Sequence, residues 1–110
     1  MRRGPFTKDE ITLCTYGARF DGRDIGGIEA ICSIRGRSKA SIELKIRNIA
    51  SMLDEEGISR ESDVHALTGR PTGESGRRTN WEWVKPLTSL PRSELLERCR
   101  AILDAHQREA

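Results

Sequence analysis

The chain begins with apolar residues at the spacing of an amphipathic helix. Apolar side chains recur every three or four residues from Ile11 to Ala18. Thr7 precedes this stretch, and Glu10 stands three residues after Thr7. This is the spacing of a capping box, in which each side chain accepts a hydrogen bond from the other residue's backbone N–H. The pattern predicts a helix over residues 7–19.

A short helix and a longer one are predicted next. Asp24 is the expected N-cap of the short helix, and Gly36 is its expected stop. Ser38 is the expected cap of the longer helix, which is predicted over residues 38–55. Apolar residues at steps of four, three and four give the longer helix a buried face: Ile42, Ile46, Ile49 and Leu53.

The second half of the chain is less regular. Residues 59–67 allow a short helix, whereas residues 68–79 predict an irregular, exposed segment because they contain three glycines and a proline. Alternation over residues 81–84 predicts an extended strand with both tryptophans on one face. A final amphipathic helix is predicted over residues 91–108, with Pro91 in its first turn.

These elements predict one mainly α-helical domain, which suits a chain of 110 residues. Residues 6–56 form its three-helix unit of helix-turn-helix (Myb/homeodomain-like) type, because a tight turn precedes the third helix. Residues 57–86 are expected to be a loop-rich segment containing Trp81 and Trp83. The C-terminal helix, within residues 87–110, is expected either to pack on the three-helix unit or to pair with its twin in a homodimer.

The composition gives little evidence for a membrane-spanning segment, a metal site or an oxidising cellular compartment. No apolar run exceeds three residues, far below the roughly 20 that a membrane span needs. The first residues lack the apolar stretch of a signal peptide, and three cysteines form neither an even framework nor a CxxC pair. We therefore expect a cytoplasmic protein without metal or cofactor, in which the cysteines pack as small apolar residues.

The net charge of +2 conceals an uneven distribution. Between Arg35 and Arg47 there are five basic residues and one acidic residue, so this stretch carries +4 and the remainder −2. With its isoleucines inward, the third helix is expected to turn its polar residues outward, where its positive end also favours phosphate. The candidate nucleic-acid-binding residues are Arg35, Arg37, Ser38, Lys39, Ser41, Lys45, Arg47 and Asn48, and Arg77 and Arg78 form a secondary basic loop.

One resemblance supports this interpretation. The string GRSKASIELKIRNIASML over residues 36–53 resembles the helix-turn-helix segment that precedes the nuclease domain in bacterial HNH-type restriction endonucleases, with the pattern GRS..AV..K..N.A..L. The opening FTKDEI is similar to that family's FT.EE start, and the likeness extends over residues 6–84. It implies that five of the candidate residues occupy the family's pattern positions: Arg37, Ser38, Lys39, Lys45 and Asn48.

Catalysis is not expected. An HNH nuclease needs several histidines to hold a metal and activate water. The chain has only His65 and His106, which are far apart and lack a neighbouring histidine or a preceding aspartate. Both are expected to be structural or solvated, so the chain is predicted to be a non-enzyme.

Two functions remain open. The first is a small non-catalytic DNA-binding protein of helix-turn-helix type, encoded by a phage or mobile element, with double-stranded DNA as its partner. In this hypothesis the third helix lies in the major groove and Asn48 approaches a base edge. The alternative is a protein-interaction module or inhibitor that binds a nucleic-acid-processing complex. Its acidic stretches, Asp54–Glu56 and Glu94–Glu97, would then face a basic partner.

Overall fold

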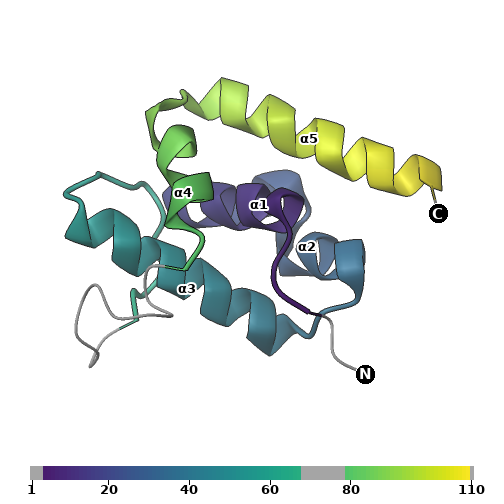
Figure 1. The fold of residues 1–110 in the computed structure, drawn as a ribbon. Helices are drawn as coiled ribbons and strands as arrows, with labels where there is room; N and C mark the ends of the chain where they lie inside the picture. The colour runs from purple at the N-terminus through teal and green to yellow at the C-terminus, as the bar shows by residue number, and fades with distance from the viewer. Residues whose placement is uncertain (1–3, 68–78, 110) are drawn as a thin grey trace.

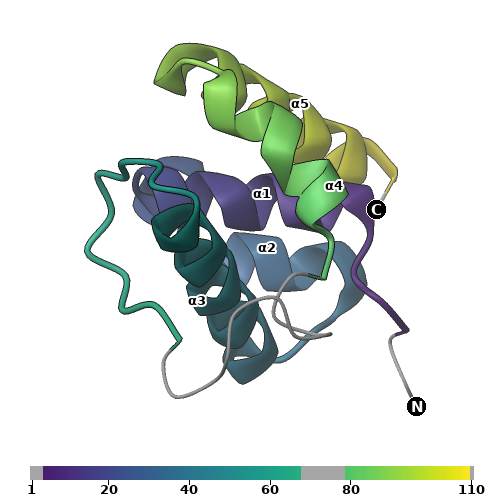
Figure 2. The ribbon, with the colours of Figure 1, turned by 60° about the vertical axis from the view of Figure 1, so that its left-hand side comes forward.

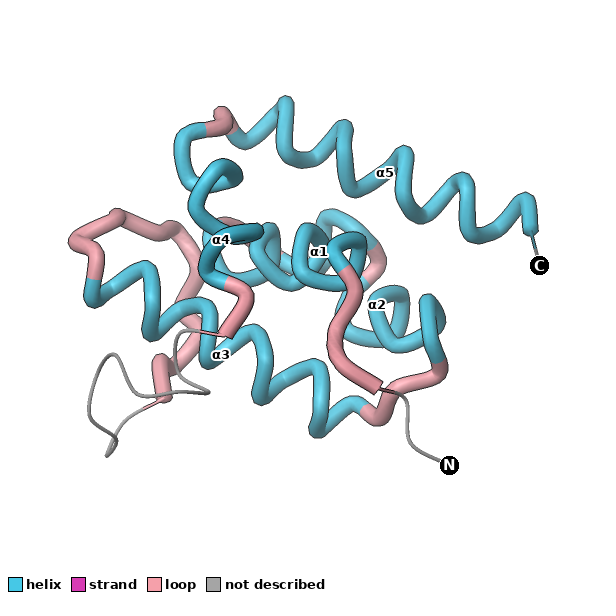
Figure 3. Tube along the Cα trace, viewed as in Figure 1, coloured by secondary structure: helices cyan, strands magenta, loops and turns pink. Residues whose placement is uncertain are grey.

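The structure is a computed structural model that describes residues 4–67 and 79–109. The elements of these residues are α1 (Lys8–Arg19), η1 (Gly22–Ile25), α2 (Gly27–Arg35), α3 (Lys39–Glu55), α4 (Trp81–Val84), η2 (Lys85–Ser89) and α5 (Arg92–Glu109), of which η1 and η2 are 3₁₀ helices. The described residues contain no strand, so the prediction of a mainly helical fold is confirmed (Figure 3). None of the described helices is both long and apolar enough to cross a lipid bilayer.

Helix α1 is the centre of the molecule. Every residue from Glu10 to Ala18 is buried, because α5 covers one side of the helix and the pair α2 and α3 covers the other (Figures 1 and 2). The close approach to α3 depends on Gly17, where an added Cβ would lie only 3.3 Å from Cδ1 of Ile46. A helix covered all round in this way is a core element rather than a surface element.

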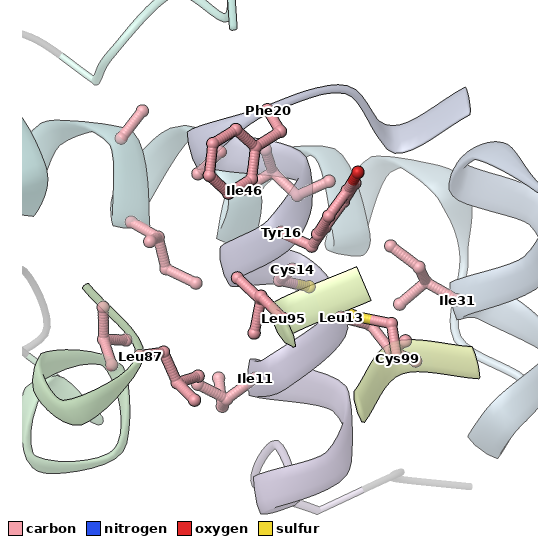
Figure 4. Close-up of a cluster of buried hydrophobic side chains, with 14 of the residues drawn as sticks. Ile11, Leu13, Cys14, Tyr16, Phe20, Ile31, Ile46, Leu87, Leu95 and Cys99 are labelled. Atoms are coloured by element: carbon pink, nitrogen blue, oxygen red, sulfur yellow. The ribbon is translucent and has the colours of Figure 1, made fainter. Parts of the chain in front are cut away.

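The core gathers side chains from elements that are distant in sequence. Figure 4 shows Ile31 of α2, Leu87 of η2 and Leu95 of α5 converging on α1. Ile31 and Leu95 are fully buried and Leu87 nearly so. Burial of such an aliphatic side chain stabilises the fold by roughly 1.5–3 kcal/mol. The second half of the chain is therefore packed on the three-helix unit by the same core.

Local signals fix the starts of α1 and α3 as the sequence predicts. The capping box of Thr7 and Glu10 is formed in full. Gly36 ends α2 in the left-handed conformation with φ of 73°, which glycine adopts readily. Ser38 caps α3 by accepting a hydrogen bond from the backbone N–H of Ser41 at 3.2 Å. A turn of three residues, 36–38, thus joins α2 to α3.

The predicted N-cap of the second helix is wrong. Helix α2 begins one residue after Gly26, and a separate 3₁₀ turn, η1, comes before it with Asp21 as its cap. Asp24 lies inside this turn, and its carboxylate accepts hydrogen bonds from Tyr16 and Arg92 instead. The sequence pattern could not show that the carboxylate of Asp24 bonds to Tyr16 and Arg92 instead of capping α2.

The short helix allowed for residues 59–67 does not form. The chain turns back after α3 and runs beside it in an extended course (Figures 2 and 3). The N–H of Glu61 donates to the carbonyl of Arg19 at 2.7 Å, and the hydroxyl of Ser62 donates to the carbonyl of Ala18. These carbonyls belong to the last turn of α1, where no intrahelical N–H is available, so this segment satisfies them.

The predicted strand over residues 81–84 is also wrong, because these residues form the single helical turn α4. The N–H groups of Trp83 and Val84 both donate to the carbonyl of Asn80. The two tryptophans are partly buried against the core, and residues two apart on a helix point in different directions. The end of the segment expected to be loop-rich, from Trp81 onward, is therefore helical.

Candidate nucleic-acid interface and the adjoining groove

Arg37 does not face solvent as the sequence suggested. Its side chain is 6% exposed and forms an ion pair with Glu10 of α1, with 2.5 Å between Nε and Oε2. Nη2 donates to Oε1 of Glu10 at 3.1 Å and to the carbonyl of Pro5 at 2.9 Å. The guanidinium lies over the ring of Phe6, 4.1 Å from its centroid. Arg37 is therefore an internal link between the α2–α3 turn and α1.

Lys45 and Asn48 are buried as well, so the expectation that they face outward is wrong. The ammonium of Lys45 donates to Oδ1 of Asn48 and to the carbonyl of Thr79, both at 3.3 Å. It lies 5.4 Å from the ring centroid of Phe6. Burial lowers the pKa of Lys45, because desolvation disfavours its charged form.

The wide buried side of α3 explains this difference. The isoleucine stripe is buried, as predicted, and it packs against α1. The neighbouring stripe, which contains Lys45 and Asn48, is covered by Phe6 and by the residues that lead into α4. Both covering segments lie far from α3 in sequence, so periodicity within α3 could not reveal them.

Five of the predicted contact residues remain at the surface. Arg35, Ser38, Lys39 and Arg47 are exposed, and Ser41 is partly buried. Lys39 pairs with Glu29 at 3.3 Å, but the two side chains are 63% and 72% exposed, so this pair is weak and easily exchanged.

The outer side of α3 is less basic than expected. With Arg37 and Lys45 inside, the exposed charges between Arg35 and Arg47 are three basic residues and Glu43, which give +2 in place of +4. Leu44 lies beside Glu43 and is 54% exposed.

The chain on either side of residues 68–78 is attached to α3. The N–H of Leu67 donates to the carbonyl of Arg47 at 3.4 Å, and the hydroxyl of Ser51 donates to the carbonyl of Leu67 at the same distance. Thr79 is held by Lys45 at 3.3 Å. The secondary basic loop predicted at Arg77 and Arg78 lies outside the described residues. The sequence suggested that Lys45 binds nucleic acid. In the structure Lys45 instead attaches the chain at Thr79 to α3.

An open groove of about 740 Å³ adjoins the exposed side of α3. It lies between α3 and the segment formed by η1 and the start of α2, and Val64 and His65 also line it. The apolar part of its lining comes from Gly17, Ile28, Ile46 and Val64. Sequence reasoning missed the groove because η1 and the extended segment after α3 create two of its sides.

Most of the charged side chains around the groove bond to other groups of the chain. Arg23 binds Asp21 with 2.8 Å between Nη2 and Oδ2, and this hydrogen bonding lowers the pKa of Asp21 to about 2. Lys39 pairs with Glu29 on the opposite side, and Arg47 donates to the carbonyl of His65 at 3.0 Å. The surroundings of the groove thus carry both signs of charge.

The thiols and histidines form no cluster suited to a metal in the part of the chain that the structure describes. Burial raises the pKa of both Cys14 and Cys99 to about 12. A thiol that remains protonated at neutral pH is a poor nucleophile. These two cysteines therefore act as core side chains.

No protein-family model, curated protein or solved structure matches the chain.

Proposed function

We propose that the chain is a non-catalytic DNA-binding module that contacts the phosphates of a duplex through the α2–α3 turn and the exposed side of α3. The observation that carries the proposal is the exposure of Lys39 and Arg47, which lie two turns apart on one face of α3, and of Arg35 at the end of α2. Basic side chains on one helix face neutralise phosphates and release condensed counterions.

The start of α3 supports the same orientation. Ser38 and Lys39 are exposed at a helix N-terminus that follows a turn of three residues. The first backbone N–H groups of a helix and its dipole favour an anion in this position. A duplex docked here would place phosphates near the first turn of α3, as helix-turn-helix proteins do.

The buried residues change the kind of recognition that we propose. Asn48 is only 5% exposed, so it does not supply the base contact that the sequence suggested. Phosphate contacts from basic side chains carry no sequence information of their own. We therefore propose binding with weak sequence preference and a strong dependence on salt.

The salt dependence of binding to duplex DNA tests this proposal. Three phosphate contacts predict a slope of log K against log salt of about −2.7 for duplex DNA. In a titration followed by fluorescence anisotropy, Lys39→Gln combined with Arg47→Gln should reduce the size of that slope by about two. The matched control combines Lys85→Gln with Arg100→Gln, which are exposed on η2 and α5.

The outcomes separate cleanly. A loss of affinity and slope in the α3 variant, with the control unchanged, supports the proposal. Equal DNA affinity of the α3 variant and the control variant would show that the exposed side of α3 does not contact DNA. No binding by the unmodified chain at low salt would reject DNA as the partner.

A further inference from the structure

The turn of residues 36–38 lies between two of the cations proposed to contact phosphates. Arg35 is the last residue of α2 and Lys39 is the first residue of α3, and both are exposed. Arg37 stands midway between them in sequence, but its side chain is turned inward and is 6% exposed. The conformation of this turn therefore determines how Arg35 and Lys39 are placed relative to each other.

Each end of the turn is bonded to the helix that it adjoins. The N–H groups of Gly36 and Arg37 both donate to the carbonyl of Cys32 in α2, at 2.8 and 3.2 Å. At the other end, the carbonyl of Ser38 accepts a hydrogen bond from the N–H of Ile42 in α3 at 3.2 Å. These backbone bonds hold the two ends, and the side chain of Arg37 holds the middle of the turn.

The guanidinium of Arg37 attaches the middle of the turn to α1 in one orientation. Its Nε and Nη2 donate to the two carboxylate oxygens of Glu10, and Nη2 also donates to the carbonyl of Pro5. Such a two-point pair constrains direction as well as distance. The ring of Phe6 lies against the guanidinium. Because both side chains of the ion pair are shielded from solvent, their attraction is stronger than it would be in water.

Glu10 is itself fixed, so the anchor of the turn does not move independently. Its Oε1 accepts a hydrogen bond from the N–H of Thr7 at 2.9 Å, and its own N–H donates to the hydroxyl of Thr7 at 3.3 Å. Glu10 belongs to the buried part of α1, the helix at the centre of the molecule. The turn is thus attached to the core of the protein and not to another surface segment.

We propose that Arg37 is a positioning residue for DNA binding, which holds the α2–α3 turn in the conformation that presents Arg35 and Lys39 to phosphates. Arg37 does not touch the duplex, because its guanidinium is buried behind the turn. This role rests on the proposed DNA binding and adds a residue that lies behind the interface. A turn that is ordered before binding need not be ordered by the ligand, and such preorganisation increases affinity.

Arg37→Lys tests this role in the full chain, because it keeps the positive charge and loses the two-point pair. In the anisotropy titration we expect the affinity for duplex DNA to fall about tenfold, which is the cost of ordering roughly one backbone residue on binding. The slope of log K against log salt should stay unchanged, because the number of phosphate contacts is the same. Arg35→Gln removes a direct contact and should instead reduce the size of the slope by about 0.9.

The order of the turn is a second readout, and it needs no DNA. We expect the heteronuclear NOE of the backbone amides of Gly36 and Ser38 to fall in Arg37→Lys, because the middle of the turn loses its attachment to α1. This measurement reports motion on the picosecond-to-nanosecond timescale. The amide of Ala105 in α5 should keep its value.

Two further variants separate positioning from a general loss of stability. Arg92→Ala breaks the ion pairs at the start of α5 and should leave both the DNA affinity and the NOE of the turn unchanged. Phe6→Leu keeps the ion pair of Arg37 and removes only the ring that lies against it. It should give a smaller loss of affinity at constant slope, and it serves as the test if Arg37→Lys does not fold.

The outcomes distinguish the positioning role from the proposed function. Unchanged affinity in Arg37→Lys, with Arg35→Gln weakened, would overturn the positioning role and leave DNA binding in place. A smaller slope in Arg37→Lys would show that Arg37 contacts a phosphate itself, and an equal loss of affinity in Arg92→Ala would reduce the effect to stability. Affinity lost without any change in the NOE of the turn would also overturn the role. No binding by the unmodified chain at low salt would reject both.

Discussion

The guanidinium of Arg37 and the carboxylate of Glu10 form an ion pair in the protein interior, with side chains 6% and 0% exposed. The same carboxylate accepts a hydrogen bond from the N–H of Thr7 at 2.9 Å, which closes the capping box of α1. One acidic side chain thus starts the central helix and neutralises the base in the α2–α3 turn. A residue chosen from the sequence as a DNA contact is in fact part of the framework.

Removal of this carboxylate should destabilise the fold strongly. We expect Glu10→Gln to lower the free energy of unfolding by about 3–5 kcal/mol, because Arg37 is left as a buried charge without its counterion. Urea denaturation followed by circular dichroism measures the change. Asp21→Asn is the matched control, since it removes the partner of the exposed Arg23 and should leave the midpoint nearly unchanged. Similar losses in both variants would contradict the prediction.

The pH dependence of the ion pair follows from Glu10. Burial alone would raise the pKa of Glu10, but hydrogen bonds from Arg37 and Thr7 outweigh burial and hold the pKa below the ordinary 4.5. A carboxylate of depressed pKa contributes stability above its unfolded pKa and loses it as pH falls through the folded value. The gap in unfolding free energy between the unmodified chain and Glu10→Gln should therefore stay constant down to about pH 4.5 and shrink below it. A gap that persists in strong acid would refute the assignment.

Lys45 should respond differently from Arg37, although both cations lie against Phe6. Lys45 has no carboxylate in hydrogen-bonding contact among the described residues, and its burial lowers its pKa. Lys45→Met should therefore leave the unfolding free energy at neutral pH unchanged or higher, since a desolvated charge is replaced by an apolar chain of similar length. Arg37→Met should lower it, because Glu10 then loses its partner. Thermal denaturation of the two variants side by side decides between these outcomes.

Arg92 should control the attachment of α5. Its guanidinium binds Asp24 through Nη2 and Glu61 through Nη1 at 3.3 Å, so it joins α5 to η1 and to the segment after α3. In Arg92→Ala, we expect faster amide hydrogen exchange in α5 while the amides of α3 stay protected. Arg100→Ala, on the exposed side of α5, is the control and should exchange like the unmodified chain. Equal exchange in both variants would show that core packing alone holds the helix.

The sequence was informative where the determining contacts are local. Thr7 with Glu10, and Ser38 with Ser41, are three residues apart, and both caps form as predicted. The isoleucine stripe of α3 packs on α1 for the same reason, because its periodicity lies within one helix. Fold class could therefore be predicted from spacing alone.

The sequence did not predict burial or local structure where these depend on contacts between residues far apart in the chain. Lys45 is buried because Phe6 and Thr79 cover it, 39 and 34 positions away. Residues 59–67 stay extended because their partners are carbonyls at the end of α1. Residues 81–84 span about one turn, too short for a period of two to be distinguished from a period of 3.6. The candidate site lost three residues through these tertiary contacts.

The attachment of Leu67 and Thr79 to α3 also bears on how the chain can evolve. Because α3 holds the chain at both Leu67 and Thr79, we expect the described core and the order of its helices to stay unchanged when residues are inserted between these two positions. The entropy of closing a loop grows slowly with its length, by about 0.6 kcal/mol for each doubling. We therefore expect an inserted peptide, or even a small inserted domain, between Leu67 and Thr79 to leave the surface of α3 as it is.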